Sequence, residues 1–526
     1  MNLVFMRHGE AVDNVKQIIS DKEIYWSTLT PIGESEVENT LISLHGLQID
    51  KIYVSPMPRT IQTANLVRKV YKDVEYIIDN RIKEIDHGKY SGQANNQDLD
   101  QTRERQSMGN YFIRFGQYGE NKMDIELRLS EFLMDVCASN IQSNTILIIS
   151  HGSITSFMKR ILGIKTPHLK TGKAEAYENV DFRLVFKYYK HLKNILKEES
   201  QRRIKIVQSL NLNNELKRTL IKMCKKEVNN IEFDNNVFEN YIDGLGTKQL
   251  VQRQTSRFDD GVILICFYND FENFAKKWME HYINIGVKNF VLVNNDSRDT
   301  STAIVNLYKN IINLDLWDIN DSYNCYKMCG WRQKLIDFYG TRTYLFVDSD
   351  ELYVFKKYKD RDINNFIEKS KCDCIKSLMI DVYSKNGIED VDLDNYEYAD
   401  KNAYRMSNNN CYGERYYGGV RSRVFNIKPS LQKISVLRYT GNEILINDHF
   451  YYPWKLNKTA CLNAFLLHYK FLPGDLIKYR QFANDGRHWN NSREYKEYVK
   501  ILDMNIKNFY DKEHSALVDD VINAIK

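Results

Sequence analysis

Apolar runs and amphipathic stretches alternate in two separate parts of the chain. In the first part, runs typical of buried strands lie at 3–6, 49–55, 74–78 and 145–150. Stretches with the spacing of helices accompany them at 31–45, 61–67, 126–139 and 154–162. The second part repeats the pattern, with strands at 262–267, 289–293 and 343–347 and a helix at 272–285. Such alternation is typical of parallel sheets covered by helices, so we predict two three-layer α/β domains.

The segment between these two parts is charged and rich in lysine but keeps helical spacing. We predict a domain at 1–190, a helical linker at 191–256, a second domain at 257–475 and a helical extension at 476–526. The lysines of the linker suit either a solvated helix face or a basic surface that contacts an anionic membrane. The solvated face is the simpler interpretation.

Composition narrows the class of protein. The 526 residues include 74 Lys and Arg against 69 Asp and Glu, which gives a net charge of +5. This near balance argues against a nucleic-acid-binding protein. Neither a signal peptide nor an apolar run long enough to span a membrane is evident, so we expect a cytoplasmic location, with the inner face of the membrane as the alternative.

Positively charged and imidazole side chains follow the predicted strands of the first domain. Arg7 and His8 end the first strand, Arg59 follows the second, and His151 follows the last. Because the carboxyl ends of parallel strands meet at one edge of a sheet, we expect these side chains to surround one crevice. Two guanidinium groups can neutralise a phosphate, one imidazole can attack it, and Glu84 can protonate the leaving oxygen. This chemistry requires no metal ion.

The first part of the chain resembles the histidine phosphatase superfamily, which has the phosphoglycerate-mutase-like fold. The matching residues are Arg7, His8, Gly9, Glu10 and Asn14; Leu29, Thr30 and Gly33; Ser55, Arg59, Thr63 and Ala64; Glu84, Gly88 and Gly92; and Ser150, His151 and Gly152. The resemblance implies that His8 becomes a phosphohistidine and that Arg7, Arg59 and His151 complete the phosphate pocket. It further implies a substrate contact for Asn14 and a proton-donor role for Glu84.

Two segments depart from the family pattern. The stretch between Gly92 and Gly119 is short and polar, and the elements with which true mutases bind bisphosphoglycerate are not recognisable there. Asn121 stands where the family often has serine after Gly-Glu, which puts a substrate contact there in doubt. We therefore favour a phosphatase acting on a phosphorylated small molecule or sugar phosphate over a mutase. The alternative is a non-catalytic binding or scaffolding module.

A cluster of carboxylates ends the third strand of the second domain. Asp348, Asp350 and Glu351 fall within four residues directly after an apolar run. Adjacent carboxylates repel one another unless a cation offsets the repulsion, and hard oxygen ligands suit Mg²⁺ or Mn²⁺. An acidic turn at a sheet edge is the alternative interpretation. Because another strand of the same domain also ends in polar residues, at Asp296, we favour a binding site over an acidic turn.

Residues 260–475 resemble family-2-like glycosyltransferases of the GT-A fold, of a type common in bacterial surface-polysaccharide loci. The matching residues are Asn269; Trp278, Met279, Glu280, His281 and Tyr282; Gly286 and Val287; Asn295, Asp296, Ser297 and Asp299; Gln333; Asp348, Ser349, Asp350 and Glu351; Lys433; and His449. The resemblance implies a nucleotide-sugar donor and a glycan acceptor.

The same resemblance suggests roles for particular residues. Substrate contacts are expected for Asn269, Asp296, Gln333 and Asp348. Metal ligands are expected at Asp350 and Asp348, with His449 or His468 as a third. The general base stays open among Asp381, Glu414 and Asp448. We therefore expect a bifunctional enzyme that combines phosphomonoester hydrolysis with metal-dependent glycosyl transfer in capsule or lipooligosaccharide biosynthesis.

Overall fold

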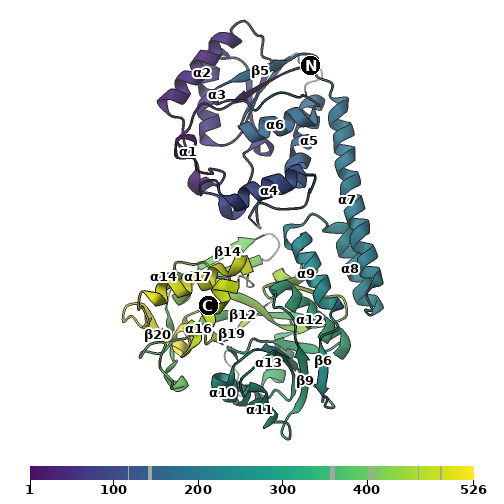
Figure 1. The fold of residues 1–526 in the computed structure, drawn as a ribbon, viewed down its shortest axis with the longest axis vertical. Coiled ribbons are helices and arrows are strands. Elements are labelled where there is room, and N and C mark those ends of the chain that lie inside the picture. Colours follow the sequence, from purple (N-terminus) through teal and green to yellow (C-terminus); the bar gives the residue numbers. More distant parts are fainter. Residues whose placement is uncertain are drawn as a thin grey trace. The chain divides into compact units, whose positions relative to one another are not determined.

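The computed structural model describes residues 1–116, 118–139, 145–355, 362–401, 405–409, 413–459, 461–485 and 489–525. The chain divides into two compact units (Figure 1). The first unit contains Met1–Arg202 and Lys225–Asn235, and the second contains Arg203–Cys224 and Asn236–Lys526. Each unit has its own β-sheet covered by helices, so the prediction of mixed α/β architecture is confirmed.

The first unit contains a five-stranded sheet of order β3-β2-β4-β1-β5. Its strands are β1 (Asn2–Arg7), β2 (Lys51–Val54), β3 (Glu75–Ile78), β4 (Thr145–Ser150) and β5 (Ala174–Tyr177). The four predicted strands run parallel, and β5, which the sequence pattern did not indicate, pairs antiparallel with β1. The carboxyl ends of β1, β2 and β4 therefore lie together at one edge.

Helices cover both faces of this sheet. They are α1 (Val12–Lys16), α2 (Pro31–Leu44), α3 (Pro58–Val70), α4 (Gln97–Ser107), α5 (Lys122–Ser139) and α6 (Gly152–Ile161). Alternate residues of β1 enter different clusters: Leu3 and Phe5 pack with apolar residues of α5 and α6, whereas Val4 and Met6 pack with those of α2 and α3. This alternation is the period-two pattern of a strand buried on both faces.

The expected linker is divided between the two units. It consists of α7 (Arg183–Ser209), α8 (Asn214–Lys226), the short helix η4 (Ile231–Phe233) and α9 (Asn235–Gly246). The boundary falls inside α7, after Arg202, instead of at residue 190. The segment after α8 belongs to the first unit because Asn229 accepts a hydrogen bond from Asn121 (2.9 Å) and donates one to Asp124 (2.7 Å).

The second unit contains a nine-stranded sheet of order β11-β19-β12-β16-β10-β7-β8-β9-β6. Its strands are β6 (Val251–Gln254), β7 (Ile263–Tyr268), β8 (Asn289–Asn295), β9 (Asn313–Ile319), β10 (Thr343–Phe346), β11 (Glu351–Phe355), β12 (Cys374–Asp381), β16 (Gln432–Arg438) and β19 (Cys461–His468). The strands β10, β7 and β8 are parallel, as predicted, and β9, which the sequence pattern did not indicate, is parallel to β8. The strands β16, β6 and β11 pair antiparallel with their neighbours. The acidic motif follows β10, at the carboxyl edge of the parallel part.

The helices of this unit include α10 (Glu272–Asn284), α12 (Cys325–Tyr339) and α14 (Gly419–Phe425). The C-terminal residues add α16 (Asp475–Asp485), α17 (Trp489–Asp503), β20 (Ser515–Leu517) and α18 (Val518–Ala524). They are part of the second unit, because Tyr479 and Tyr498 share an apolar cluster with Phe425 and Phe471. Among the described helices, none is long and apolar enough to cross a membrane.

Candidate functional site

Residues that follow three parallel strands meet at the carboxyl edge of the first unit's sheet. Arg7 pairs with Ser150 in the register of β1 and β4, so His8 and His151 leave adjacent strands side by side. Their imidazole rings are 5.2 Å apart between centroids and meet edge to face. Arg59 reaches the same place from the first turn of α3. The structure thus brings these four predicted residues together.

Hydrogen bonds determine the tautomer of His8. Its Nδ1 lies 2.7 Å from Gly9 O, and because a carbonyl only accepts, Nδ1 carries the proton. The lone pair of the neutral ring is then on Nε2, which receives a hydrogen bond of 3.2 Å from Arg59 Nε. Burial, reinforced by Arg59 and Arg7, lowers the pKa of His8 well below its ordinary value. A neutral imidazole with its Nε2 lone pair facing a guanidinium is suited to attack a phosphate bound there.

The second imidazole, that of His151, has one ring nitrogen without a partner in the described part of the chain. Its Nε2 is 2.8 Å from the hydroxyl of Ser55, whereas its buried Nδ1 has no hydrogen-bond partner among the described residues. Burial lowers the pKa of His151 well below its ordinary value, so the ring is neutral. If the Ser55 hydroxyl donates to Nε2, Nδ1–H is left as an unused donor. An orphaned buried donor beside a nucleophile is suited to stabilise a transferring phosphoryl group.

The two guanidinium groups are held by backbone carbonyls. Arg7 Nη1 donates to Leu169 O (3.0 Å), and Arg59 Nη1 donates to Ser20 O (3.1 Å). Neither arginine forms an ion pair with a carboxylate in the part of the chain that the structure describes. Burial lowers the pKa of Arg7, which shows that its charge is held at a desolvation cost. Two guanidinium groups without a direct ion pair to a described carboxylate, beside a neutral histidine, make a pocket suited to an anion.

Glu84 lies close to His151, whereas the side chain of Asn14 makes a contact within its own helix start. Glu84 Oε2 is 4.0 Å from His151 Nδ1, and its other oxygen accepts a hydrogen bond from Ile85 N (2.9 Å). Its side chain is 17% exposed, so it lies at the mouth, where a leaving group would stand. Asn14 instead uses its side-chain oxygen to accept from Ala11 N (3.0 Å) at the start of α1. Its expected substrate contact stays a prediction.

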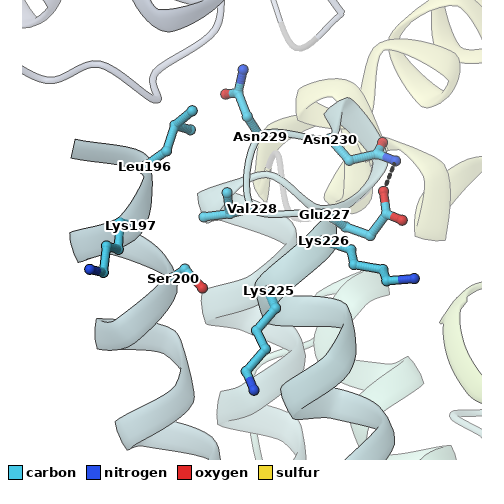
Figure 2. Close-up of a pocket in the computed structure, with 9 residues that line it drawn as sticks. All are labelled: Leu196, Lys197, Ser200, Lys225, Lys226, Glu227, Val228, Asn229 and Asn230. Atoms are coloured by element: carbon cyan, nitrogen blue, oxygen red, sulfur yellow. Dashed lines mark hydrogen bonds between the residues drawn. The ribbon is translucent and has the colours of Figure 1, made fainter. Parts of the chain in front are cut away.

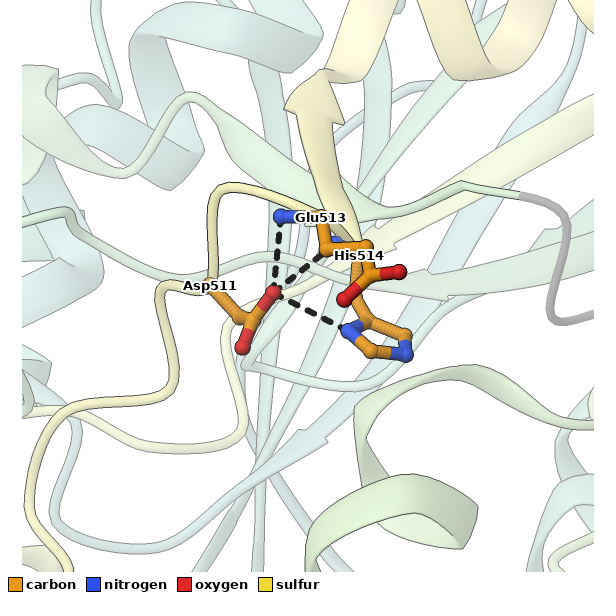
Figure 3. Close-up of side chains that lie close together, drawn as sticks. All are labelled: Asp511, Glu513 and His514. Atoms are coloured by element: carbon orange, nitrogen blue, oxygen red, sulfur yellow. Dashed lines mark hydrogen bonds and ion pairs between the residues drawn. The ribbon is translucent and has the colours of Figure 1, made fainter.

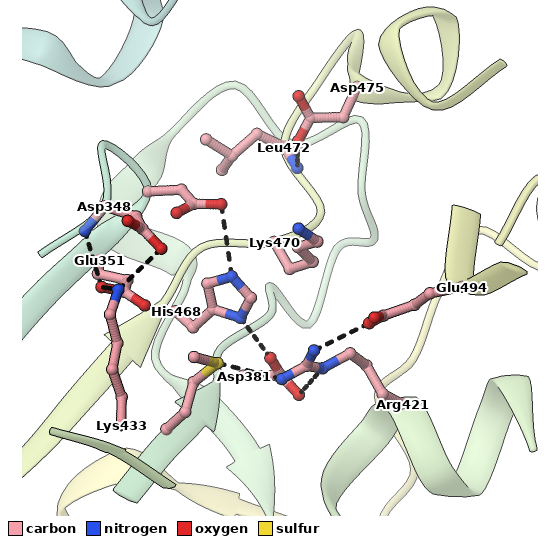
Figure 4. Close-up of polar contacts among 12 residues, drawn as sticks. Asp348, Glu351, Asp381, Arg421, Lys433, His468, Lys470, Leu472, Asp475 and Glu494 are labelled. Atoms are coloured by element: carbon pink, nitrogen blue, oxygen red, sulfur yellow. Dashed lines mark hydrogen bonds and ion pairs between the residues drawn. The ribbon is translucent and has the colours of Figure 1, made fainter. Parts of the chain in front are cut away.

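In the second unit, two buried cations bind Asp348. One carboxylate oxygen accepts from Arg332 Nη2 (2.8 Å) and the other from Lys433 Nζ (2.8 Å). Lys433 also donates to Glu351 Oε2 (2.8 Å), as Figure 4 shows. Both oxygens of Asp348 are therefore engaged by fixed charges. Its expected roles as a metal ligand and as a substrate contact stay predictions.

Asp350 begins a separate chain of contacts through His468, and Figure 4 shows the part of it from His468 to Glu494. His468 Nε2 lies 3.4 Å from Asp350 Oδ2, and His468 Nδ1 lies 2.6 Å from Asp381 Oδ1. Arg421 Nε donates to the other oxygen of Asp381 (2.8 Å) and Arg421 Nη1 to Glu494 (2.9 Å). Against the effect of burial, His468 holds the pKa of Asp350 well below its usual range, and the two aspartates raise the pKa of His468. Asp350 Oδ2 and His468 Nε2 are two atoms of the kinds that bind divalent cations once the imidazole has lost its proton, and their expected role as metal ligands stays a prediction.

Other predicted positions of the second unit lie apart from this pair. Gln333 is fully buried, and its amide accepts from Leu445 N (2.9 Å) and donates to Glu443 O (3.2 Å), which joins α12 to the distant segment 443–445. Its expected substrate contact stays a prediction. His449 Nδ1 contacts Gln432 O at 2.5 Å, so His468 is the imidazole that meets Asp350.

Two further expected substrate contacts lie at ends of strands. Asn269, after β7, donates to Asn295 O (2.7 Å) and thereby ties two adjacent strand ends together. Asp296 is exposed after β8 and has a positive φ of 58°. Both stand at the predicted edge of the sheet, and their contact with a nucleotide stays a prediction.

Two more surface features were not predicted. A cavity of about 610 Å³ lies in the first unit, away from His8, and Figure 2 shows its lining: Leu196, Lys197, Ser200, Lys225, Lys226, Glu227, Val228, Asn229 and Asn230. Asp511, Glu513 and His514 bring three potential ligand atoms within 4.8 Å of one another (Figure 3). The second group is explained by a turn, since Asp511 Oδ1 accepts from Glu513 N (2.8 Å) and contacts His514 Nδ1 (3.0 Å).

Comparisons with solved structures return phosphatases that align with the first unit. A phosphoserine phosphatase from Entamoeba histolytica, bound to phosphoserine, is 22% identical, covers 34% of this chain and 92% of its own, and has a TM-score of 0.30. A mycobacterial glucosyl-3-phosphoglycerate phosphatase is 18% identical, covers 33% of this chain and 91% of its own, and has a TM-score of 0.29.

Sequence comparison gives a more direct relation. A 2,3-bisphosphoglycerate-dependent phosphoglycerate mutase from Thermoplasma acidophilum is 37% identical over 95 residues, which are 18% of this chain. The match spans 46% of that protein, less than half its length. Residues 3–181 match the model of the histidine phosphatase superfamily (branch 1). The N-terminal third of the chain therefore carries a histidine phosphatase superfamily domain.

Proposed function

We propose that the first unit hydrolyses phosphomonoesters of small molecules through a phosphohistidine at His8. The observation that carries this proposal is the pairing of a neutral His8, whose Nε2 lone pair faces Arg59 Nε, with Arg7 and Arg59, which form no ion pair with a described carboxylate. Such a pocket attracts a phosphate dianion and holds it against the nucleophile.

The reaction has two steps. His8 Nε2 attacks phosphorus, the P–N bond forms and the bond to the leaving oxygen breaks, while Arg7, Arg59 and the Nδ1–H of His151 stabilise the equatorial oxygens. Glu84 gives a proton to the leaving oxygen. In the second step Glu84 takes a proton from water, which attacks phosphorus and releases inorganic phosphate and neutral His8.

The test uses the full chain and a panel of sugar phosphates, phosphoserine and phenyl phosphate. We expect phosphate release and an acid-labile phosphoryl label on His8 that is lost in His8→Ala. A transfer of the label to a hydroxyl group of an acceptor molecule without phosphate release would indicate a mutase. A folded chain that takes no label and releases no phosphate would instead support a binding or scaffolding module.

We further propose that the second unit is a GT-A-type glycosyltransferase that moves a sugar from a nucleotide donor to a glycan acceptor, in capsule or lipooligosaccharide biosynthesis. The supporting observation is the contact between Asp350 and His468 beyond the carboxyl edge of the parallel strands. Mn²⁺ or Mg²⁺ bound there would neutralise the diphosphate of the leaving nucleotide. Asp381 holds Nδ1 of His468, so that Nε2 faces Asp350.

Manganese binding to the full chain tests this second proposal. We expect Asp381→Asn to weaken Mn²⁺ affinity about 10- to 100-fold, measured by calorimetry or by the electron paramagnetic resonance of free Mn²⁺. Asp400→Asn is the matched control, because Asp400 is an equally buried aspartate paired with Arg423 and not with a histidine. Equal affinities in the wild type and Asp381→Asn would contradict the assignment.

A further inference from the structure

A loop after α6 covers one side of the phosphate pocket. Arg7 Nη1 donates to Leu169 O (3.0 Å), and Arg7 N donates to Lys173 O (3.0 Å). Gly172 N donates to His8 O (2.8 Å), which fixes the loop to the nucleophile as well. The loop is therefore built into the pocket wall, and its side chains are candidates to meet whatever is attached to the phosphate.

His168 is the side chain of this loop that reaches the catalytic groups. A Cβ atom placed on Gly152 would lie 2.3 Å from His168 Nε2 and 3.1 Å from Arg7 Cζ. The imidazole thus uses the space that a glycine leaves at the start of α6 and lies beside the guanidinium of Arg7. Burial lowers the pKa of His168, Arg7 lowers it further, and Glu84 raises it. His168 is therefore a neighbour of both the phosphate-binding arginine and the proton donor.

A hydrogen-bond network settles which nitrogen of His168 is available. Ser156 Oγ lies 3.0 Å from Gly152 O and 2.8 Å from His168 Nδ1. The hydroxyl has one proton, and the carbonyl of Gly152 can only accept it. Ser156 Oγ must then accept from His168 Nδ1–H. In the neutral ring this leaves a lone pair on Nε2, the atom that lies beside Arg7.

We propose that His168 Nε2 accepts a hydrogen bond from a hydroxyl group of the leaving alcohol and thereby selects polyhydroxylated phosphomonoesters, of which sugar phosphates are the typical class. A lone pair favours a hydroxyl donor and repels a second phosphate or a carboxylate at this position. The proposal rests on the phosphatase function of the first unit. It adds a residue that contacts the leaving group to those that hold the phosphate.

The experiment compares two substrates in the full chain. Glucose 6-phosphate offers hydroxyl groups on its leaving alcohol, whereas phenyl phosphate offers none. In His168→Ala we expect the ratio of kcat/KM for glucose 6-phosphate to that for phenyl phosphate to fall about tenfold. His168→Gln should restore the ratio because the amide oxygen of glutamine reaches the position of Nε2, and His168→Asn should not. Lys165→Ala, an exposed change on the same loop, is the control.

The outcomes separate this proposal from the one on which it rests. A ratio within twofold of the wild type in His168→Ala, or an equal loss with both esters, overturns the leaving-group contact. Phosphate release from neither ester by the wild type, without a label at His8, overturns the phosphatase function itself. Thermal denaturation of each variant confirms that the exposed substitutions leave the chain folded.

Discussion

Replacing Ser55 by alanine tests the assignment of the proton on His151. Ser55 is fully buried and its hydroxyl lies 2.8 Å from His151 Nε2. Without it, the proton of the neutral ring can move to Nε2, and Nδ1 then turns a lone pair toward the negatively charged phosphoryl oxygens. We expect phosphorylation of His8 to slow strongly while the ion pairs and the sheet stay intact.

The size of the effect follows from the contact that is lost. Leaving a buried polar atom without its partner costs about 1–3 kcal/mol. If that cost appears in the transition state, where Nδ1–H is needed, the rate of phosphoryl transfer falls by roughly five- to 150-fold. The substrate KM should change less, because Arg7 and Arg59 still hold the phosphate.

Rapid-quench measurement of phosphohistidine formation gives the rate directly. Ser150→Ala is the matched control, because Ser150 is an equally buried hydroxyl one residue before His151 that donates to Ile82 O (2.7 Å) and not to an imidazole. Its loss reports the cost of removing a buried hydroxyl. If both variants slow phosphorylation to the same degree, or if neither does, the tautomer of His151 is not what Ser55 controls.

Three other changes test the wider structure. Because the pKa values of His8 and His151 are lowered in the folded chain, the unfolded chain binds more protons below pH 6.5. Urea titrations should therefore show that the free energy of unfolding of the first unit falls from pH 7 to pH 5, and that it falls less in His8→Ala. An equal fall in the wild type and in His8→Ala would contradict this. Arg421→Met should lower the free energy of unfolding of the second unit by about 3–5 kcal/mol, since it removes the guanidinium from the buried carboxylate of Asp381 and leaves that charge with His468 alone; an unchanged thermal midpoint would refute that. Gly33→Ala should destabilise the first unit by about 1–3 kcal/mol in the same titrations, because its Cβ would lie 2.0 Å from Glu10 O, and a neutral effect would mean that the backbone can move apart.

The local sequence pattern predicts those parts of the fold that depend on residues close together in the sequence. The N-cap at Thr30 accepts from Gly33 N (3.1 Å), as the Thr-Pro start of α2 indicates. The edge where His8 and His151 meet follows from counting parallel strands, because strand direction alone decides where their carboxyl ends lie. For this reason the core of the phosphate pocket could be placed from sequence.

Partners that are distant in sequence could not be predicted in the same way. Ser55 and His151 are separated by 96 residues. Arg332, which donates a hydrogen bond to Asp348, is a single arginine in a helix whose sequence gives no sign of this contact. Gln333 lies one position further on the same helix and is buried in the core. Which of two adjacent polar residues faces a site depends on helix rotation against the sheet, and the weak amphipathic pattern of α12 does not fix that rotation.

The path of the chain through α7, α8 and α9 affects how the protein is made. Residues 203–224 of the second unit are synthesised before the segment that completes the first, which runs from Lys225 to Asn235. A nascent first unit on the ribosome therefore lacks Asn229, and with it the hydrogen bonds to Asn121 and Asp124, until part of the second unit has emerged. A cut after Gly246 separates residues 203–224 from the rest of the second unit, and a cut before Arg183 leaves the first unit without residues 183–202 and 225–235.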